Sequence, residues 1–397
     1  MSTLALPLER AGRRDALRLD WMVIALVLAI VLLGLVMVTS ASISIASRES
    51  GEAFIYLYRQ LVLAATGLVC AALVFCVRTD LLERISGPLA VAAGALLLLV
   101  LLPGIGHEVN GSRRWIRLAG FNFQVSELAR VLVLIYVASY AVRREAELRT
   151  TFLGLLQPLG VLGLFAGLLV VEPDFGAACV LFVSGFGVLF LAGARLRYVL
   201  VLTVGALGIG ALIAVNSAYR LRRLTGFLDP WADPFDTGFQ LTQSLIAIGR
   251  GQWFGVGLGG SVQKLFYLPE AHTDFLFAVL AEELGLFGVL LTMGLFLALV
   301  WRVFTIARLA AEAGLKFQAW LATGFALWLG TQVLINIGVN MGVLPTKGLT
   351  LPLMSYGRSS LIVTLAWTGL VLRVYHEATR QVRSPTAMRE SPKGRSP

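Results

Sequence analysis

The chain has 397 residues, of which 57% are hydrophobic and only 14% are charged. Soluble domains carry roughly 25% charged residues, so this composition excludes an ordinary soluble protein and indicates one that crosses a membrane many times. The net charge of +10 comes from basic residues that flank apolar runs rather than forming one patch, which argues against nucleic-acid binding. The three cysteines match no metal or redox spacing and are expected to be small buried hydrophobes.

Ten apolar runs are long enough to cross a bilayer as helices, and they predict an all-α polytopic membrane domain over residues 21–377. A basic tail, residues 1–20, precedes them without an apparent cleavable signal peptide. The tail 378–397 is rich in Pro, Ser, Lys and Arg and is predicted to be disordered. The runs lie near residues 21–41, 56–77, 86–102, 124–142, 153–171, 175–193, 197–217, 274–303, 317–341 and 358–377.

The order of the runs also predicts their orientation. An even number of spans places both termini on one side, and the basic residues around the tails and alternate loops place that side in the cytoplasm. Residues 218–273 then form a large extracytoplasmic loop. Within it, Leu241, Leu245 and Ile248 recur at helical spacing and predict a short helix at the interface or dipping into the bundle. The segment GVGLGG lacks the βαβ context of a dinucleotide fingerprint, so we interpret it as tightly turned backbone near a ligand.

Several basic residues lie on the outer side, against the topological tendency. They suggest an anionic ligand there, such as phosphate or pyrophosphate. The alternative is that outer loops, especially long ones, tolerate some positive charge without a ligand. These residues are Arg113, Arg114, Arg117, Arg220, Arg222, Arg223, Arg250, Lys264, Lys347 and Arg358.

The run LPEAHTDFLFAVLAEELG, residues 268–285, places Asp274 at the mouth of an apolar span and Glu282 and Glu283 within it. On a continuous helix, the eight residues from Asp274 to Glu282 rise about 12 Å, which would put Glu282 and Glu283 well inside the membrane. Ionisable groups there cost roughly 2.5–3.5 kcal/mol each, so they indicate a function. The alternative for Asp274 is that it only caps the helix. No Glu or Gln stands three residues after Thr273 or Asp274, so a capping box is missing.

Other polar residues recur at helical spacing inside predicted spans. Glu127 and Arg130 are three residues apart and can pair on one helix face, either as a structural ion pair or as part of a site. A stripe at i, i+4 and i+8, formed by Gln332, Asn336 and Asn340, must face other helices or a cavity, with interhelical hydrogen bonding as the simpler hypothesis. The connector VEPDFG places Glu172 and Asp174 at the outer surface, where Asp174 is expected to cap the next helix.

No Ser–His–Asp arrangement, zinc motif or phosphate-binding loop stands out, so the residues alone leave an enzyme, a transporter and a scaffold open. Over nearly its whole spanning length, however, the chain resembles the SEDS family (shape, elongation, division and sporulation proteins). The tetrapeptide PTKG resembles the division and sporulation branch, because the rod-shape branch usually has PVTG. The segments that carry the resemblance are GSRRWI at 111–116, QVSELAR at 124–130, EPDFGAA at 172–178, HTDFLFAVLAEELG at 272–285 and NIGVNMGVLPTKGLTLPLMSYGRSS at 336–360.

Three positions depart from the family pattern. The family usually has QPSE-x-x-K, where this chain has Val125 and Arg130, so the family's Glu–Lys pair becomes Glu127–Arg130, with the same charge and a different geometry. Glu172 stands where the family often has Gln, and Arg358 stands where it has Gly.

The resemblance implies a peptidoglycan glycosyltransferase that polymerises lipid II at the division septum, outside the cytoplasmic membrane. The reaction is an inverting transfer with polyprenyl pyrophosphate as the leaving group. Such a group leaves without protonation if its charge is stabilised, so one general base and a cationic cradle suffice. The family's essential carboxylate matches Asp274, which we assign as the base. The expected substrate-binding residues are Arg113, Arg114, Trp115, Glu127, Arg130, Lys264, His272, Thr273, Lys347, Ser355 and Tyr356.

The resemblance implies no definite cofactor; a divalent cation could share the cradle's role, but no ligand cluster identifies one. The implied partners are lipid II, membrane lipid, a cognate class B penicillin-binding transpeptidase (FtsI-like), and division regulators of the FtsQ, FtsL, FtsB and FtsN type. Two other functions compete with the polymerase: a lipid II flippase, which the lack of a visible inverted repeat weighs against, and a non-catalytic division scaffold.

Overall fold

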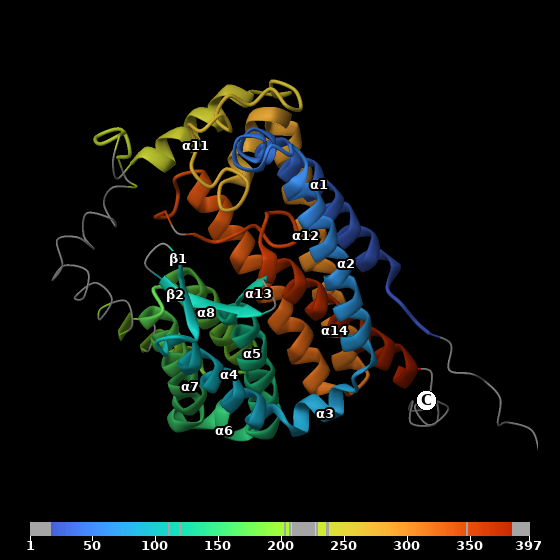
Figure 1. Cartoon of the computed structure of the whole chain (residues 1–397). Coiled ribbons are helices and arrows are strands. Elements are labelled where there is room, and N and C mark those ends of the chain that lie inside the picture. The colour runs from blue at the N-terminus through green and yellow to red at the C-terminus, as the bar shows by residue number, and fades with distance from the viewer. Residues whose placement is uncertain are drawn as a thin grey trace, which may run out of the picture.

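The computed structural model describes residues 17–109, 112–118, 121–201, 204–205, 208, 227, 229–235, 238–346 and 348–382. These residues form a bundle of helices with one small sheet (Figure 1). The helices are α1 (Trp21–Ser50), α2 (Ile55–Cys76), α3 (Thr79–Arg84), α4 (Ser86–Leu101), α5 (Val125–Arg143), α6 (Glu145–Thr150), α7 (Phe152–Val171), α8 (Phe175–Leu191), α11 (Phe239–Gly251), α12 (Leu276–Glu312), α13 (Lys316–Asn340) and α14 (Arg358–Val382). The strands are β1 (Gly106–Val109), β2 (Ser112–Leu118) and β3 (Phe121–Gln124).

The predicted spans correspond closely to these helices. Every expected span except the seventh begins within two residues of a described helix. Six described helices are long and apolar enough to cross a membrane, and α4 and α8 are shorter apolar helices. The predicted loop helix is confirmed as α11. Most of the seventh span, 197–217, and the tails 1–16 and 383–397 lie outside the described residues.

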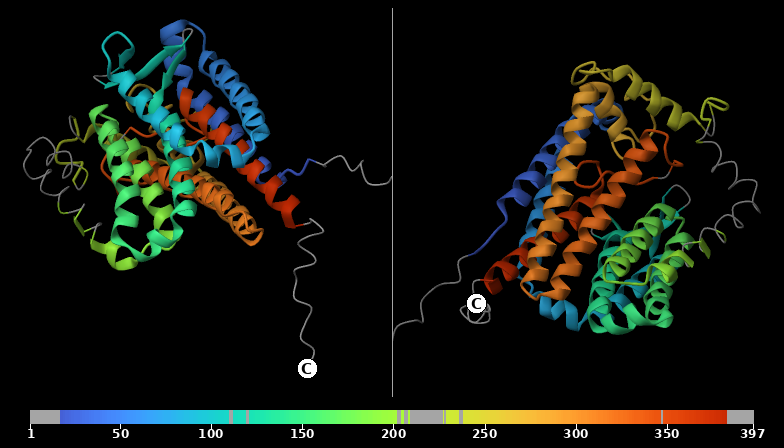
Figure 2. Two further views of the ribbon diagram at one scale, coloured as in Figure 1. Left: turned by 90° about the horizontal axis from the view of Figure 1, so that it is seen from below. Right: turned by 180° about the vertical axis from the view of Figure 1, so that it is seen from behind.

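The helices form two groups that α13 joins (Figures 1 and 2). In one group, α14 packs along α2, and α12 packs against α1. In the other, α4 packs against α5, and α7 packs against α8. Helix α13 contacts α12 and α14 on one side and α5 and α8 on the other. Polar side chains on α13 can therefore reach both groups.

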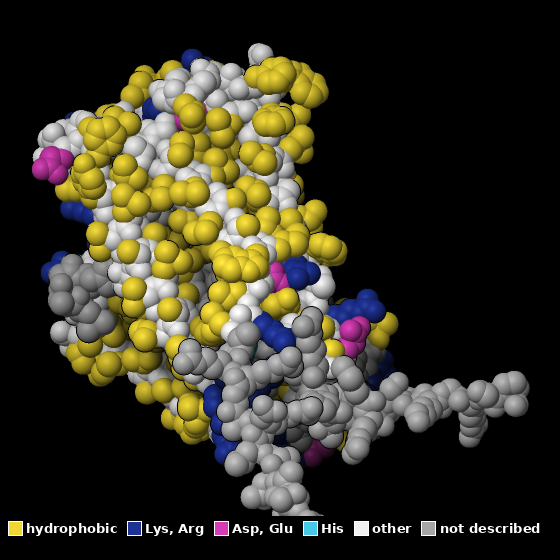
Figure 3. Space-filling model, turned by 90° about the vertical axis from the view of Figure 1, so that its right-hand side faces the viewer, with side chains coloured by type: hydrophobic (Ala, Val, Ile, Leu, Met, Phe, Trp, Pro, Cys, Tyr) yellow, Lys and Arg dark blue, Asp and Glu magenta, His cyan; other side chains and the backbone are white. Residues whose placement is uncertain are grey.

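The described parts of the chain termini meet at one end of the bundle. The backbone N–H of Arg18 donates to Nδ1 of His376 at 3.2 Å, and Arg302 on α12 pairs with Asp20 at 2.6 Å. Figure 3 shows an apolar surface over much of the bundle's height, with charged side chains gathered toward this lower end. An apolar surface is stable against the hydrocarbon core of a bilayer, and charged side chains are stable where the protein meets water. The chain is therefore a membrane protein.

The segment between α4 and α5 folds into a three-stranded antiparallel sheet, which the sequence analysis treated only as a loop. Side chains alternate between the two faces of a strand. Arg113 and Arg117 accordingly lie on the exposed face of β2, where Arg113 pairs with Glu108 at 2.9 Å. Arg114 lies on the opposite face and is only 25% exposed. The sheet thus separates adjacent arginines into one exposed ion pair and one cation turned toward the bundle.

Helix α12 is not continuous, because Gly285 has φ +65° and ψ −163°. The backbone groups freed by this break bond to the segment after α11. The carbonyls of Glu282 and Glu283 accept from the N–H groups of Val256 and Gly257, at 2.9 and 3.1 Å. The N–H groups of Leu286 and Phe287 donate to the carbonyls of Gln252 and Trp253, at 2.8 and 3.2 Å. The break lies after Glu283, so it does not interrupt the helical turns from Leu276 to Leu284 that separate Asp274 from the two glutamates. The depth of Glu282 and Glu283 in the membrane stays a prediction.

The glycines after α11 allow this close contact. A Cβ atom on Gly251 would lie 1.9 Å from the carbonyl oxygen of Ala281, and one on Gly255 would lie 2.1 Å from that of Glu283. These distances are far inside van der Waals contact. The glycine-rich segment therefore lies against the break in α12; the prediction that it approaches a ligand is not tested among the described residues.

Candidate functional site

Asp274 lies in the turn that precedes α12. Phe275 is the N-cap residue of α12, and no side chain caps the helix there, so the hypothesis that Asp274 only caps it is wrong. Among the described residues, the Asp274 carboxylate has no hydrogen bond or ion pair. Its Oδ2 faces the backbone of the PTKG segment, where a Cβ atom on Gly348 would lie 2.8 Å away. Lys347, expected as a substrate cation, lies outside the described residues.

The environment of Asp274 changes its acidity. The pKa of Asp274 is raised from 3.8 to about 7, chiefly by burial and also by the negative charges of Glu270 and Asp174, with Arg114 acting in the opposite direction. The residue as a whole keeps some exposure, whereas its carboxyl group is surrounded by protein. A carboxylate with a pKa near neutrality and no partner can accept a proton from an alcohol far better than an ordinary Asp can.

A second carboxylate, Asp174, organises the neighbouring helix ends. Its Oδ1 accepts from the N–H of Ala177 at 3.1 Å, which confirms the predicted cap on α8. Its Oδ2 accepts from Ser126 Oγ at 2.8 Å and from Gln124 Nε2 at 3.0 Å. Arg114 lies 3.6 Å from Asp174. This residue therefore joins β2, α5 and α8, and holds Arg114 where it also acts on Asp274.

Glu172 and Asp174 were both expected at the outer surface, but both side chains are buried. The Glu172 side chain is fully buried, and neither of its carboxylate oxygens has a partner among the described residues. The pKa of Glu172 is raised to about 8, chiefly by burial and also by the negative charge of Asp174, with Arg114 acting in the opposite direction. At neutral pH this group is therefore mostly a neutral acid, with the same shape and charge as the Gln found at this position in the family.

The predicted polar stripe on α13 is buried, and its three side chains all form hydrogen bonds, although Asn336 Oδ1 has no partner among the described residues. Gln332 accepts from Arg130 at 3.1 Å and donates to the carbonyl of Thr350 at 3.1 Å. Asn336 donates to the carbonyls of Leu349 and Asp274, and Asn340 donates to that of Asp274. Interhelical hydrogen bonding is confirmed, and most of the partners are backbone carbonyls rather than other side chains.

The predicted Glu127–Arg130 pair is also confirmed, and it is buried. Arg130 has no exposed surface; its guanidinium lies 5.7 Å from the Trp328 ring and bonds to Gln332. The bond from Arg130 to Gln332 links α5 to α13. Because the Glu127–Arg130 pair is buried, it can affect a substrate only through the residues that it contacts.

Aromatic rings pack beside Asp274. His272, Tyr56 and Tyr356 form a cluster with ring centroids 4.9 to 5.7 Å apart. The backbone N–H of Tyr356 donates to the carbonyl of His272 at 3.0 Å, which ties the start of α14 to the Asp274 segment. Burial lowers the pKa of His272, so its ring is neutral. Its Nδ1 and the Tyr356 hydroxyl have no partner among the described residues.

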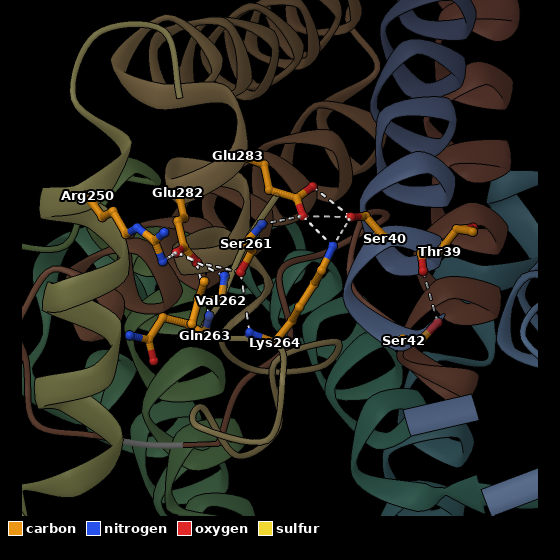
Figure 4. Close-up of polar contacts among 10 residues, drawn as sticks. All are labelled: Thr39, Ser40, Ser42, Arg250, Ser261, Val262, Gln263, Lys264, Glu282 and Glu283. Atoms are coloured by element: carbon orange, nitrogen blue, oxygen red, sulfur yellow. Dashed lines mark hydrogen bonds and ion pairs between the residues drawn. The ribbon is translucent and has the colours of Figure 1, made fainter. Parts of the chain in front are cut away.

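Glu282 and Glu283 form a separate cluster of buried polar groups (Figure 4). Glu283 accepts from Lys264 Nζ and Ser40 Oγ, both at 2.7 Å. Glu282 pairs with Arg250 at 3.2 Å and accepts from Ser261 Oγ and the N–H of Val262. Lys264 is 7% exposed and paired with Glu283, which weighs against the headgroup-binding role expected of it; that role stays a prediction. The anionic partners of Arg250 and Lys264 in this structure are thus the carboxylates of Glu282 and Glu283.

The remaining candidates have less distinctive surroundings. Arg113 is exposed on β2, and the neighbouring Trp115 has a buried Nε1 without a described partner. Thr273 donates to Glu270 at 2.7 Å, and Ser355 accepts from the N–H of Leu351 at 3.0 Å. No group of three or more His, Cys, Asp or Glu side chains that could hold a metal occurs in the described part of the chain. Arg220, Arg222 and Arg223 lie outside it.

The network around Asp174 and the link from the α13 stripe to Asp274 were not predicted from the sequence. The segment SRRWIRL has no regular polar–apolar alternation, so its pattern could not have predicted a strand or the opposite directions of Arg113 and Arg114. No sequence signal could have shown that Ser126 and Gln124 bond to Asp174, because that contact joins segments about 50 residues apart.

The chain is similar to known proteins along nearly its full length. A family model described as cell cycle protein, covering FtsW, RodA and SpoVE, matches residues 20–380. A relative described as probable peptidoglycan glycosyltransferase FtsW, from Alkalilimnicola ehrlichii, is 54% identical, over 99% of this chain and 98% of its own. A relative with the same description from Thioalkalivibrio sulfidiphilus is 54% identical, over 92% of this chain and 91% of its own.

Two solved structures share the fold. One is a chain from a peptidoglycan synthase complex described as coordinating polymerization and crosslinking; it is 36% identical, covers 91% of this chain and 99% of its own, and has a TM-score of 0.76. The other is the rod shape determining protein RodA of Thermus thermophilus, 34% identical over 91% of this chain and 98% of its own, with a TM-score of 0.67.

Proposed function

Because this chain belongs to the FtsW, RodA and SpoVE family of cell cycle proteins, we propose that it is a peptidoglycan glycosyltransferase that polymerises lipid II. One observation of the structure carries the proposal. Asp274, in the run that resembles the family motif, is a carboxylate with no described partner and a pKa of about 7. Carboxylates placed for structural reasons in a membrane protein are normally paired, as Glu282 and Glu283 are here.

In the proposed reaction, the 4-hydroxyl of one lipid-linked disaccharide attacks the anomeric carbon of another. The new bond joins the hydroxyl oxygen to that carbon, and the bond from the carbon to the pyrophosphate oxygen breaks. Asp274 accepts the hydroxyl proton and later releases it to water. Attack on the face opposite the leaving group inverts the anomeric centre. Polyprenyl pyrophosphate leaves without a proton, so only its charge must be stabilised.

Cations near Asp274 are the proposed stabilisers of that charge. Arg114 is the best placed of the described cations, because its charge acts on Asp274. Its guanidinium is held by Asp174, at a distance of 3.6 Å between Arg114 and Asp174. Arg113 and Lys347 remain proposals from charge and position in the chain. A divalent cation in the same role would need ligands beyond the described carboxylate groups.

The proposed setting is the division site of a bacterial cytoplasmic membrane, with both termini in the cytoplasm. The contacts of Arg18 and Asp20 with α14 and α12 support a shared side for the two termini. The similarity to a chain of a peptidoglycan synthase complex supports a transpeptidase partner of the penicillin-binding class. Contacts with lipid II, with surrounding lipid and with FtsQ-, FtsL-, FtsB- and FtsN-type regulators remain proposals of the family resemblance.

The test is lipid II polymerisation by the purified protein in complex with its cognate transpeptidase, with glycan chain length as the readout. The wild type should form glycan, and Asp274→Asn, which keeps the shape but removes the base, should form at least about 100-fold less. Asp80→Asn is the matched control, because Asp80 is exposed beside Arg78, outside the proposed site. Normal polymerisation by Asp274→Asn would refute the assignment of the base. Lipid II movement between leaflets without glycan would establish the flippase alternative, and neither activity would favour a scaffold.

A further inference from the structure

Asp274 has a carboxylate that no described side chain holds, so its position depends on its backbone. Two side-chain amides fix that backbone. The Asp274 carbonyl accepts from Asn336 Nδ2 at 2.9 Å and from Asn340 Nδ2 at 3.1 Å. Both donors come from the C-terminal half of α13, which packs against α12.

The two asparagines have different further duties. Asn340 Oδ1 accepts from the N–H of Ala278 at 3.2 Å, a first-turn donor of α12 that also donates to the carbonyl of Phe275 at 3.1 Å. Asn336 Nδ2 donates instead to the carbonyl of Leu349 at 2.5 Å. A single amide group thus holds the Asp274 carbonyl and the carbonyl that follows Gly348.

That double contact sets the relation between the two segments that meet at the carboxylate. One segment carries Asp274, and the other is the PTKG connector, whose Gly348 faces Oδ2 of Asp274. Gln332, one turn earlier on the same face of α13, donates to Thr350 and so anchors the connector a second time. Asn336 is the member of the stripe that bonds to both segments.

We infer that Asn336 is a positioning residue of the proposed reaction, which sets the distance between Asp274 and the connector that carries Lys347. The inference rests on the proposed glycosyltransferase function. Asn336 is 2% exposed, so it acts through the two backbone segments that it joins. A shift of about 1 Å in a reacting group can lower a rate by about 100-fold, so two hydrogen bonds at this point matter more than their contribution to stability.

The test replaces Asn336 with Leu, which keeps the shape and removes both donors. Polymerisation of lipid II by the transpeptidase complex should fall about 10- to 100-fold in kcat, while KM stays within about twofold. Asn336→Ser is the second variant: it keeps one short donor, should fold more readily and should fall between wild type and Leu. The matched control is Gln318→Leu, because Gln318 is a buried amide on α13 that bonds to Thr79, four turns from the stripe.

A second readout separates positioning from a purely structural role. Hydrogen exchange should rise in both the 268–280 and the 345–353 segments of Asn336→Leu and stay unchanged in Gln318→Leu. Unchanged kcat, a rise in only one segment, or an equal loss of kcat in Gln318→Leu would overturn the inference. If the wild-type complex forms no glycan, the proposed function fails, while the exchange data still decide whether Asn336 couples the two segments.

Discussion

The carboxylates at the two ends of one short helical segment have opposite surroundings. Asp274 has no described partner, and its pKa is raised to about 7. Glu282 and Glu283 are fully buried, and each is neutralised by a cation, a hydroxyl group and backbone N–H groups. The paired carboxylates hold the chain together, whereas the unpaired one is free to react. Neither burial nor the lack of a partner identifies a catalytic group by itself, because Glu172 is also buried without a described partner. Asp274 differs from Glu172 in that it lies in the run that resembles the family motif and faces the PTKG connector.

The difference arises from the segment after α11. Its backbone closes around the break at Gly285 and brings Ser261, Val262 and Lys264 to the two glutamates. No equivalent segment donates to the Asp274 carboxylate among the described residues; the Asn336 and Asn340 amides bond to its carbonyl instead.

The strongest test of the contrast removes one partner from the paired region. Glu283→Leu leaves the Lys264 ammonium buried without compensation, which should destabilise the protein by about 3–5 kcal/mol. The double variant Glu283→Leu with Lys264→Met should recover most of that loss, since no buried charge remains. Thermal unfolding in detergent measures both. Equal stability of wild type and Glu283→Leu would show that the cluster does not stabilise the fold. Glu312→Gln is the control: it breaks the exposed Arg308–Glu312 pair and should have no measurable effect on stability.

Gly285→Ala tests whether the break creates the paired region. The φ and ψ of Gly285 suit only glycine, and a Cβ atom would lie 2.3 Å from the backbone nitrogen of Gly255. Strain of about 1–3 kcal/mol is expected, with a further cost from the clash. Gly294→Ala is the matched control, because Gly294 lies on the same helix with open space around it. A melting temperature that falls no further in Gly285→Ala than in Gly294→Ala would contradict this account.

The pH dependence of polymerisation tests the unpaired region. The proposed base acts only when deprotonated, and burial raises the pKa of Asp274 to about 7. The rate should therefore rise with pH through about 7 and fall about tenfold per unit well below it. Initial rates of glycan synthesis between pH 5 and 9 measure this, with integrity of the transpeptidase complex checked at each pH. A rate that stays constant down to pH 5 would mean that no group of raised pKa controls the reaction.

The smallest expected effect belongs to Glu172, which is buried without a partner but lies outside the proposed chemistry. The pKa of Glu172 is about 8 in the folded protein and 4.5 as the ordinary value of an unfolded chain. The contribution of Glu172 to the free energy of unfolding is therefore fully present below pH 4.5 and is lost as the pH rises through 8. Glu172→Gln should polymerise normally at pH 7, and its melting temperature should fall less between pH 6 and pH 9. An identical fall in both proteins would show that Glu172 does not titrate in this range.

The sequence by itself determined most of the helices and the candidate residues, but not the small sheet. Apolar runs of about 20 residues have no stable alternative to helices in lipid, so nine of the ten spans, all except the seventh, could be predicted to within two residues at their starts. The helical spacing of Glu127 and Arg130 and of the α13 stripe depends only on the local repeat, and both predictions are confirmed. The cap by Asp174 is likewise local.

Tertiary structure alone decided which polar groups found partners. Arg114, Lys264 and Arg250 look alike in sequence as outer cations, yet Lys264 and Arg250 neutralise Glu283 and Glu282. Glu172, expected at the surface, is buried, because the connector that carries it packs into the bundle. The free energy of a buried charge depends on what lies within a few ångströms, and those neighbours come from segments up to about 240 residues away, as Ser40 does for Glu283.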